Sequence, residues 1–81
     1  MDLIALTEYL VKSLVNDKDS VSVKQFETDD DTILIQVMVD SSSIGAVIGK
    51  AGKIANAIRT IVQASSYING NKRVKINIDS F

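Results

Sequence analysis

The first hydrophobic segment has the spacing of an amphipathic helix. Between residues 3 and 15, apolar side chains recur every three or four positions, with charged and hydroxyl side chains between them. The main stripe consists of Leu3, Leu6, Leu10 and Leu14. Asp2 is a suitable N-cap, and polar residues 16–20 follow the segment. We therefore predict a helix over residues 3–15 that packs on a core by its leucine side.

Two alternating segments follow, and they predict a β-hairpin. Residues 21–28 and 32–39 are rich in β-branched side chains and are separated by only three residues, which requires an antiparallel pair. In the second strand one face holds four apolar residues, which we assign to the core: Ile33, Ile35, Val37 and Val39. In the first strand Phe26 is out of phase with the valines before it. Either a β-bulge intervenes or Phe26 is partly exposed.

Two further helices and a third strand complete the pattern. Asp40 and the three serines after it offer N-caps for a short helix that ends near Ile48. A longer helix follows and ends near Ser65, and residues 69–71 form a turn. Residues 72–78 then alternate strictly between apolar and polar side chains, which predicts a strand whose direction the residues leave open.

The element order αββααβ predicts an α+β fold in two layers. One three-stranded sheet with three helices on one face buries the apolar stripes of all six elements. Eighty-one residues, of which 46% are apolar and 23% charged, suit a single domain over residues 1–81. Neither a linker nor a repeat divides the chain.

The composition excludes several chemistries. The chain contains no Cys and no His, which removes thiolate nucleophiles, thiolate metal ligands and the usual general base near neutral pH. Three consecutive aspartates at residues 29–31 cannot all converge on one cation, and the spacing of an EF-hand loop is missing. We therefore expect no enzymatic activity, no cofactor and no metal site. No apolar run is long enough to span a bilayer and the N-terminus lacks signal-peptide features, so we expect a cytoplasmic protein.

The net charge of −1 conceals two halves of opposite sign. Residues 1–40 contain three lysines and nine acidic residues, whereas residues 41–81 contain six basic residues and one acidic residue, Asp79. A basic half in an acidic chain can bind a polyanion locally, although the whole-molecule charge does not attract one over a distance.

The basic half contains a cluster of glycines. Three of the four glycines lie in the segment from Ile44 to Ile54, between the two later helices. A turn between helices needs one glycine as a C-cap, so the cluster exceeds the steric need. Gly49 can end the first helix, and Gly52 can open the second with no side chain in the way of an approaching backbone. The N–H groups at the start of the second helix, with Lys50 and Lys53 beside them, suit phosphate oxygens. The alternative is a tight αα-hairpin whose glycines only relieve crowding.

Two nucleotide-binding motifs do not fit this segment. A Walker A motif requires four residues between its first glycine and the Gly-Lys pair, followed by a hydroxyl side chain. Here Gly45 precedes Gly49 by only three intervening residues, and Ala51 has no hydroxyl. Rossmann glycines follow a strand, whereas these glycines join two helices.

The run Val47-Ile48-Gly49-Lys50-Ala51-Gly52-Lys53 resembles the Gly-x-x-Gly signature of KH RNA-binding domains. The αββααβ order resembles the bacterial, type II arrangement of these domains. A chain of this length with Ala57-Ile58-Arg59-Thr60 in its last helix is similar to the small bacterial KhpA family. The resemblance covers nearly the whole chain.

The resemblance implies a mixed sheet and a non-enzymatic protein that binds about four single-stranded RNA nucleotides in a groove. By position, the loop that would clamp the RNA backbone is Gly49, Lys50, Ala51 and Gly52, with Lys53 adding charge. The residues that would line the apolar floor are Ile44, Val47 and Ile48. We assign the strand edge that closes the groove to residues 34–38. The partners implied are single-stranded RNA and either a second copy of the chain or a larger KH-containing RNA-binding protein.

The chain departs from the family pattern beside the loop. Ala55 stands where a larger aliphatic residue is usual, with Ile54 one place earlier. Ala46 and Asn56 occupy positions that often carry basic residues. Because two charges are missing there, we expect low affinity for RNA from one domain and a gain from acting in pairs.

The remaining charged and aromatic residues have more ordinary interpretations. Lys72, Arg73 and Lys75 either extend a basic path or protect an edge strand from aggregation, and we favour the second interpretation. Arg59 serves solubility or a dimer contact. The aromatic residues do not interleave with the basic ones along the sequence, so no stacking platform is predicted: Tyr9, Phe26, Tyr67 and Phe81.

A different class of function also fits the sequence. A protein-interaction module can keep the same fold and use its exposed apolar residues for dimerisation. Leu34 and Met38, which face away from the core in the predicted second strand, and the helix at residues 3–15 would then form the interface.

Overall fold

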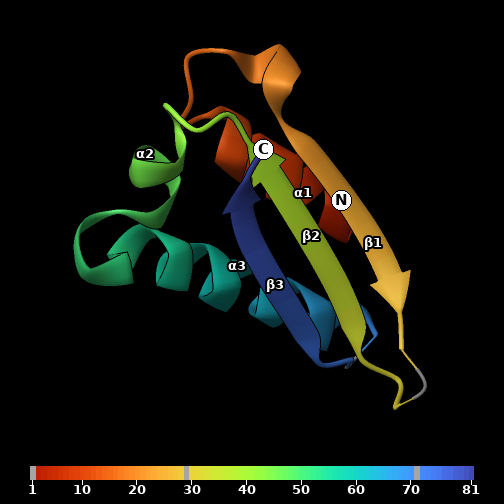
Figure 1. Cartoon of the computed structure of the whole chain (residues 1–81). Coiled ribbons are helices and arrows are strands. Elements are labelled where there is room, and N and C mark those ends of the chain that lie inside the picture. Colours follow the sequence, from red (N-terminus) through yellow and green to blue (C-terminus); the bar gives the residue numbers. More distant parts are fainter. Residues whose placement is uncertain (1, 29, 71) are drawn as a thin grey trace.

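The computed structural model describes residues 2–28, 30–70 and 72–81. Its helices, strands and two short 3₁₀ turns follow one another in this order: α1 (Leu3–Lys12), η1 (Lys18–Ser20), β1 (Ser22–Glu27), β2 (Ile33–Val39), α2 (Ile44–Ile48), η2 (Lys50–Gly52), α3 (Lys53–Asn69) and β3 (Val74–Ser80). The predicted αββααβ order is therefore confirmed (Figure 1). None of the described helices is long and apolar enough to cross a membrane.

The three strands form a mixed sheet with β2 in the centre. β1 pairs antiparallel with β2, which confirms the hairpin, and β3 pairs parallel with β2, which confirms the mixed sheet. The β1–β2 register runs without interruption from the Ser22–Met38 pair to the Glu27–Ile33 pair, so no bulge intervenes. Phe26 instead keeps 50% of its surface exposed on the outer face of the sheet.

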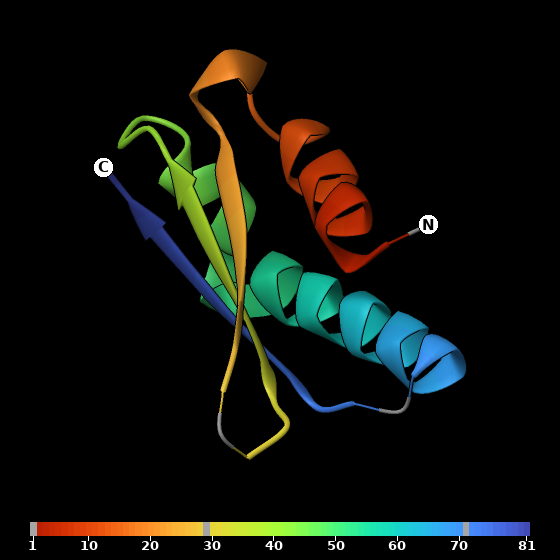
Figure 2. The same cartoon turned by 90° about the vertical axis from the view of Figure 1, so that its right-hand side faces the viewer.

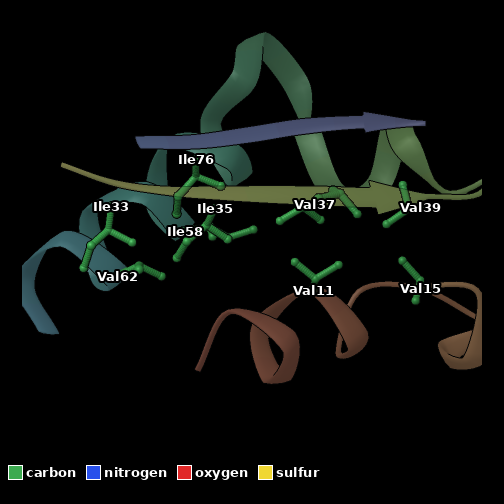
Figure 3. Close-up of a cluster of buried hydrophobic side chains, with 10 residues drawn as sticks. Val11, Val15, Ile33, Ile35, Val37, Val39, Ile58, Val62 and Ile76 are labelled. Atoms are coloured by element: carbon green, nitrogen blue, oxygen red, sulfur yellow. The ribbon is translucent and has the colours of Figure 1, made fainter. Parts of the chain in front are cut away.

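The core lies between the sheet and the helices. α1 and α3 cover one face of the sheet, while the other face carries no helix (Figure 2). α2 packs against α3 and β3. All four predicted core residues of β2 are buried, and they meet side chains from α1, α3 and β3 (Figure 3). Val47 of α2 belongs to the same cluster. The buried cluster comprises Val11, Val15, Ile33, Ile35, Val37, Val39, Val47, Ile58, Val62 and Ile76.

The buried side of α1 differs from the predicted leucine stripe. Thr7 and Val11 are the fully buried residues of this helix, and its leucines are only partly buried around the core. Thr7 satisfies its hydroxyl by donating to the Leu3 carbonyl at 2.7 Å. The helix ends at Lys12 rather than Val15. The Ser13 amide still donates to the Tyr9 carbonyl in helical register, whereas the Leu14 amide donates to the Val11 carbonyl at 3.0 Å, only three residues back, which closes the helix with a tighter turn.

Two other element boundaries differ from the prediction for a shared reason. α3 continues to Asn69 rather than Ser65, and β3 begins at Val74 rather than Lys72. The Lys72 carbonyl accepts hydrogen bonds from Gln63 Nε2 at 2.9 Å and Ser66 Oγ at 2.7 Å. These bonds tie the last turns of α3 to the connection that precedes β3, so tertiary contacts lengthen the helix and delay the strand. Asn71 of the predicted turn lies outside the described residues.

Candidate functional site

The glycine loop has a backbone that only glycine adopts easily. Gly49 ends α2 with φ 77° and ψ 173°, a region nearly restricted to glycine. Gly52 precedes α3 in the left-handed region, with φ 74° and ψ 13°. Ala51 is also left-handed, with φ 55° and ψ 26°, which costs a residue with a Cβ about 1 kcal/mol. Three of these four residues therefore keep a positive φ, which makes the loop a sharply turned and exposed link between two helices.

The hydrogen bonds of the loop correct part of the prediction about its amides. The Gly49 amide donates to the Gly45 carbonyl at 2.9 Å, and the Gly52 amide donates to the Gly49 carbonyl at 3.2 Å. The Lys53 amide turns back to the Lys50 carbonyl. These three donors are consumed inside the loop and are not available to a ligand. Among the described backbone bonds, none engages the amides of Lys50 and Ala51.

The side chains of the loop leave its outer surface open. Lys50, Ala51 and Lys53 are exposed, and neither ammonium group forms an ion pair with a described carboxylate. A Cβ built on Gly52 meets nothing within 4 Å, so the approach to this residue is unobstructed. Two unpaired amides with two cations beside them form a surface that matches phosphate oxygens.

The space beneath the loop explains the arrangement of Ile54 and Ala55. A Cβ built on Gly49 would lie 2.6 Å from Ile54 Cγ1 and 2.8 Å from its Cβ. Ile54 thus fills the space under the turn, whereas Ala55 is buried within the helix packing. The departure from the family pattern at these two positions therefore leaves the loop supported from below.

The three predicted floor residues have different surroundings. Val47 is completely buried in the core, which corrects the prediction that it lines a ligand surface. Ile44 is half-buried and packs against the same core. Ile48 is half-buried at the end of α2, directly before Gly49, and unlike Ile44 it does not belong to the residues that pack against the core.

The strand edge next to the loop belongs to β3, not to residues 34–38. Those residues lie in β2, whose two edges are both paired within the sheet, so the assignment of the groove edge to them is wrong. The Arg73 carbonyl accepts from Ile33 and the Phe81 amide donates to Val39, so odd-numbered residues of β3 bond to β2. Because backbone groups alternate in direction along a strand, the amides and carbonyls of Val74, Ile76 and Ile78 point to the outer edge.

Two side chains of α3 already bind part of this edge. Gln63 Oε1 accepts from the Val74 amide at 2.8 Å, and Arg59 Nε donates to the Ile76 carbonyl at 3.3 Å. Arg59 Nη1 also donates to Asn56 Oδ1 at 3.1 Å, which holds the guanidinium beside the strand. In the described part of the chain, no partner reaches the amide or carbonyl of Ile78. Unpaired backbone groups therefore lie on β3 near α2.

A hollow of about 470 Å³ follows the same junction of α3 and β3. Its lining comprises Arg59, Thr60, Gln63, Ala64, Tyr67 and Val74. The sequence interpretation treated Arg59 only as a solubility or dimer residue and did not consider Gln63. The sequence feature that could have identified Arg59 and Gln63 is their spacing of four residues, which places both on one side of the helix next to the apolar stripe.

The acidic and basic residues at the hairpin end are largely paired with each other. Lys72 Nζ lies 3.3 Å from Asp31 and 3.8 Å from Glu27, so its charge is compensated. Asp29 of the aspartate cluster lies outside the described residues. Lys72 therefore does not contribute to a basic path, whereas Arg73 and Lys75 are exposed.

Comparison with protein families places this geometry in context. Residues 5–78 match the family model described as the KH domain of KhpA/KhpB. An RNA-binding protein KhpA from Aquifex aeolicus is 43% identical over 77 residues, which cover 95% of this chain and 91% of that relative. An RNA-binding protein KhpA from Borreliella burgdorferi is 41% identical over 75 residues, with 93% and 89% coverage. Another from Clostridium acetobutylicum is 41% identical over 73 residues, with 90% and 95% coverage.

Solved structures with the same fold include the protein Era. Era in complex with MgGDPNP and a segment of 16S ribosomal RNA superimposes with a TM-score of 0.68 at 16% identity, over 96% of this chain and 29% of that chain. Aquifex aeolicus Era bound to GDP and aluminium fluoride gives a TM-score of 0.69 at 15% identity, over 98% of this chain and 30% of that one. At this level of identity the likeness shows the fold, which agrees with a type II KH arrangement.

Proposed function

This chain belongs to the KhpA/KhpB family of KH domains, and from that premise we propose that it is a non-enzymatic protein that binds single-stranded RNA. The loop at residues 49–52 clamps the RNA backbone, and about four nucleotides follow the junction of α3 and β3. The observation that carries the proposal is the pair of unengaged amides at Lys50 and Ala51, on an open loop with two unpaired lysines.

The clamp acts through charge-assisted hydrogen bonds. The amides of Lys50 and Ala51 donate to the phosphate oxygens, and the ammonium groups of Lys50 and Lys53 neutralise the phosphate charge. The missing side chain at Gly52 lets the sugar–phosphate backbone approach closely. Such bonds to an ionised acceptor are about twice as strong as neutral ones.

The bases then lie against β3 and the first half of α3. Ile48 offers an apolar contact next to the loop, and the unpaired amide and carbonyl of Ile78 can bond to base edges. Arg59 is seven residues after Gly52, so it lies about 10 Å along α3 from the clamp. Its guanidinium keeps three of its five N–H groups for a ligand after the two bonds to Ile76 and Asn56.

Pairing of two domains raises the low affinity that we expect from a single one. The outward face of α3 carries an uncharged stripe with a spacing of four, three and four residues, Ala57, Ile61, Ala64 and Ile68, all of them exposed. Ile61 and Ile68 expose 46% and 83% of their surface. This spacing and the small alanines suit packing against an identical helix of a second copy. The stripe thus offers a dimer interface, which the sequence interpretation had instead placed at β2 and α1.

Dimerisation through this stripe leaves Arg59 and Gln63 accessible to RNA. At 3.6 residues per turn, the stripe lies about 150° around α3 from these two residues, which face β3, and it shares only Ala64 with the lining of the hollow. Two copies joined in this way present two separate clamps to one RNA strand, and the second contact becomes intramolecular.

Replacement of the clamp by acidic residues tests the proposal. We expect the double variant K50D/A51D to lose retention of single-stranded RNA, because carboxylates would repel the phosphates. Asp is tolerated in the left-handed region, so Ala51→Asp keeps the loop conformation. The control K12D/N16D changes the net charge by the same amount as K50D/A51D, but at the end of α1 and just after it, away from the loop. Unchanged RNA binding by a folded K50D/A51D variant would remove the clamp from the proposal.

A salt titration of the same binding provides an independent measure. For single strands the logarithm of the affinity falls by about 0.7 per log unit of salt for each phosphate neutralised. We expect the slope of the wild type to correspond to two or more phosphates and to decrease in K50A. A slope near zero would favour a protein-interaction module over an RNA-binding one.

A further inference from the structure

The outer face of the sheet is a second surface without an assigned role. α1, α2 and α3 all contribute to the core on the opposite side, and nothing in the described chain covers this face (Figure 2). Along β2 the outward residues Leu34, Gln36 and Met38 are half-buried by their neighbours. The face therefore combines an apolar strip in its centre with polar and charged residues on both sides.

The strand register assembles on this face a combination that is invisible along the sequence. Phe26 pairs with Leu34, and Leu34 pairs with Lys75, so one row across the sheet holds an aromatic ring, an aliphatic side chain and a cation. Adjacent strands lie about 4.8 Å apart, so one nucleotide can contact both the Phe26 ring and the Lys75 side chain. The next row consists of one cation and two amides, Lys24, Gln36 and Asn77.

The cations of this face are not held in ion pairs. Lys24, Arg73 and Lys75 form no ion pair with any described carboxylate, in contrast to Lys72 beside them. The described acids beside this face are Asp79, at the far end of β3, and Asp30 and Asp31, which line a hollow together with Arg73 and Lys75. Of those, Asp31 is engaged by Lys72. An exposed aromatic ring with unpaired cations and side-chain amides is the composition of a surface that stacks bases and attracts phosphates.

β3 connects this face with the proposed RNA groove. Val74, Ile76 and Ile78 direct their backbone groups to the edge beside α3, while Lys75 and Asn77 of the same strand face outward from the core. Arg73, directly before the strand, is also exposed. A strand that leaves the groove over the edge of β3 thus arrives directly at the row of Lys75, Leu34 and Phe26.

We propose that the outer face of the sheet is a second binding surface for single-stranded RNA, where Phe26 stacks on a base and Lys24, Arg73 and Lys75 bind the flanking phosphates. The proposal rests on the proposed function, because it extends the RNA from the same groove. It predicts that the protein engages more nucleotides than the groove alone can hold.

The test compares a tetranucleotide with a nonanucleotide of the same base composition, both labelled with a fluorophore. A nonanucleotide offers several positions at which a four-nucleotide site can bind, and this alone raises its apparent affinity. For the wild type we expect the affinity for the nonanucleotide to exceed that for the tetranucleotide by more than this statistical factor. F26A should weaken binding of the nonanucleotide about tenfold, the loss of one stacked base, and leave the tetranucleotide unchanged. K75A should lower the salt slope for the nonanucleotide by about 0.7. The controls are Y9A, which removes an exposed aromatic ring from α1, and K12A.

Several outcomes would overturn the proposal. The first is an equal effect of F26A on both RNA lengths, and the second is no effect of F26A on either. The third is a change in the oligomeric state of F26A that accounts for its loss of RNA affinity, which would assign the face to protein association. Failure of the proposed function is distinguishable, because the wild type would then bind neither RNA, whereas full RNA binding by the K50D/A51D variant would reject only the clamp. Binding of the nonanucleotide that requires Phe26 but not the clamp would retain the sheet surface and reject the groove.

Discussion

At the scale of single residues, Gly49 and Gly52 are needed for different reasons. Gly49 combines a positive φ with a close approach to Ile54, so that neither the backbone nor the space beneath it accepts a Cβ. Gly52 has a positive φ as well, but its missing Cβ points to open space. The first glycine is therefore required both by its backbone conformation and by the space beneath it, whereas the second is required by its backbone conformation and, in the proposed clamp, by the close approach of RNA.

This difference predicts unequal costs for two matched substitutions. G49A should lower the free energy of unfolding by about 3 kcal/mol, the sum of backbone strain and overpacking against Ile54. G52A should lower it by about 1 kcal/mol, from backbone strain alone, and should reduce RNA binding more than its effect on stability suggests. Urea unfolding of both variants measures the difference. Equal losses of stability would contradict the assignment of Ile54 as the residue that excludes a side chain at Gly49.

At the scale of elements, the turn from β2 into α2 positions the loop. Asp40 accepts hydrogen bonds from the Ser42 hydroxyl and, at 3.0 Å, from the Ser20 hydroxyl, so it ties this turn to the segment before β1. Its backbone carbonyl also accepts from the Ser43 amide at 2.9 Å. The hydrogen bonds from Ser42, Ser43 and Ser20 lower the pKa of Asp40 below its ordinary value of 3.8.

The lowered pKa of Asp40 predicts how stability depends on pH. Because the folded state favours the ionised carboxylate, this contribution is present above the unfolded pKa of 3.8 and is lost as the pH falls through the lower, folded pKa. D40N should therefore be less stable than the wild type at pH 6 and should lose less stability on acidification below pH 4. Thermal unfolding between pH 2 and pH 6 measures this. A D40N profile parallel to that of the wild type would show that Asp40 does not carry the acid sensitivity.

Asp30 should also lower the stability of the fold as the pH falls, so it can be compared directly with Asp40. Hydrogen bonds from Thr28 and Thr32 lower the pKa of Asp30 below its ordinary value of 3.8 in the same way. The slope that remains in D40N should therefore decrease again in D30N/D40N.

At the scale of the whole molecule, charge and apolar surface are distributed on different sides. The described cations of the loop and of β3 lie on the side of the proposed RNA path, and the uncharged stripe of α3 lies away from it. This separation allows one copy to bind RNA and a second copy at the same time.

The stripe predicts a variant that is folded but monomeric. I61E places a charge in the middle of the proposed dimer interface and should abolish self-association, while Ile61 is exposed enough for the fold to tolerate the change. Sedimentation velocity measures the oligomeric state. The variant should keep the wild-type affinity for an RNA that covers one site. For an RNA that covers two sites its affinity should fall tenfold or more, because the avidity of a linked pair is lost. Y9E, an equally drastic change at an exposed position of α1, is the control, and a dimeric I61E would exclude the stripe as the interface.

Local patterns along the chain are by themselves enough to determine much of this protein. Alternation in residues 33–39 defines the core side of β2 because side chains alternate across a strand, and all four of the predicted residues are buried. The αββααβ order and the end of α2 directly before Gly49 follow from short-range propensities. Together with the KH-like motif, these patterns are sufficient to indicate the fold and the family.

Only the tertiary structure decided which residues meet. The sequence placed Val47 on a groove floor, but packing buries it, because the side of so short a helix that meets the core depends on its neighbours. The sequence assigned residues 34–38 to the groove edge, whereas the parallel pairing makes β3 the edge strand, and strand direction is not encoded in alternation. Phe26 and Lys75 are 49 positions apart and become neighbours across Leu34 only through the register of two pairings. Periodicity acts within one element, whereas surfaces for ligands are built by contacts between elements that are distant along the chain.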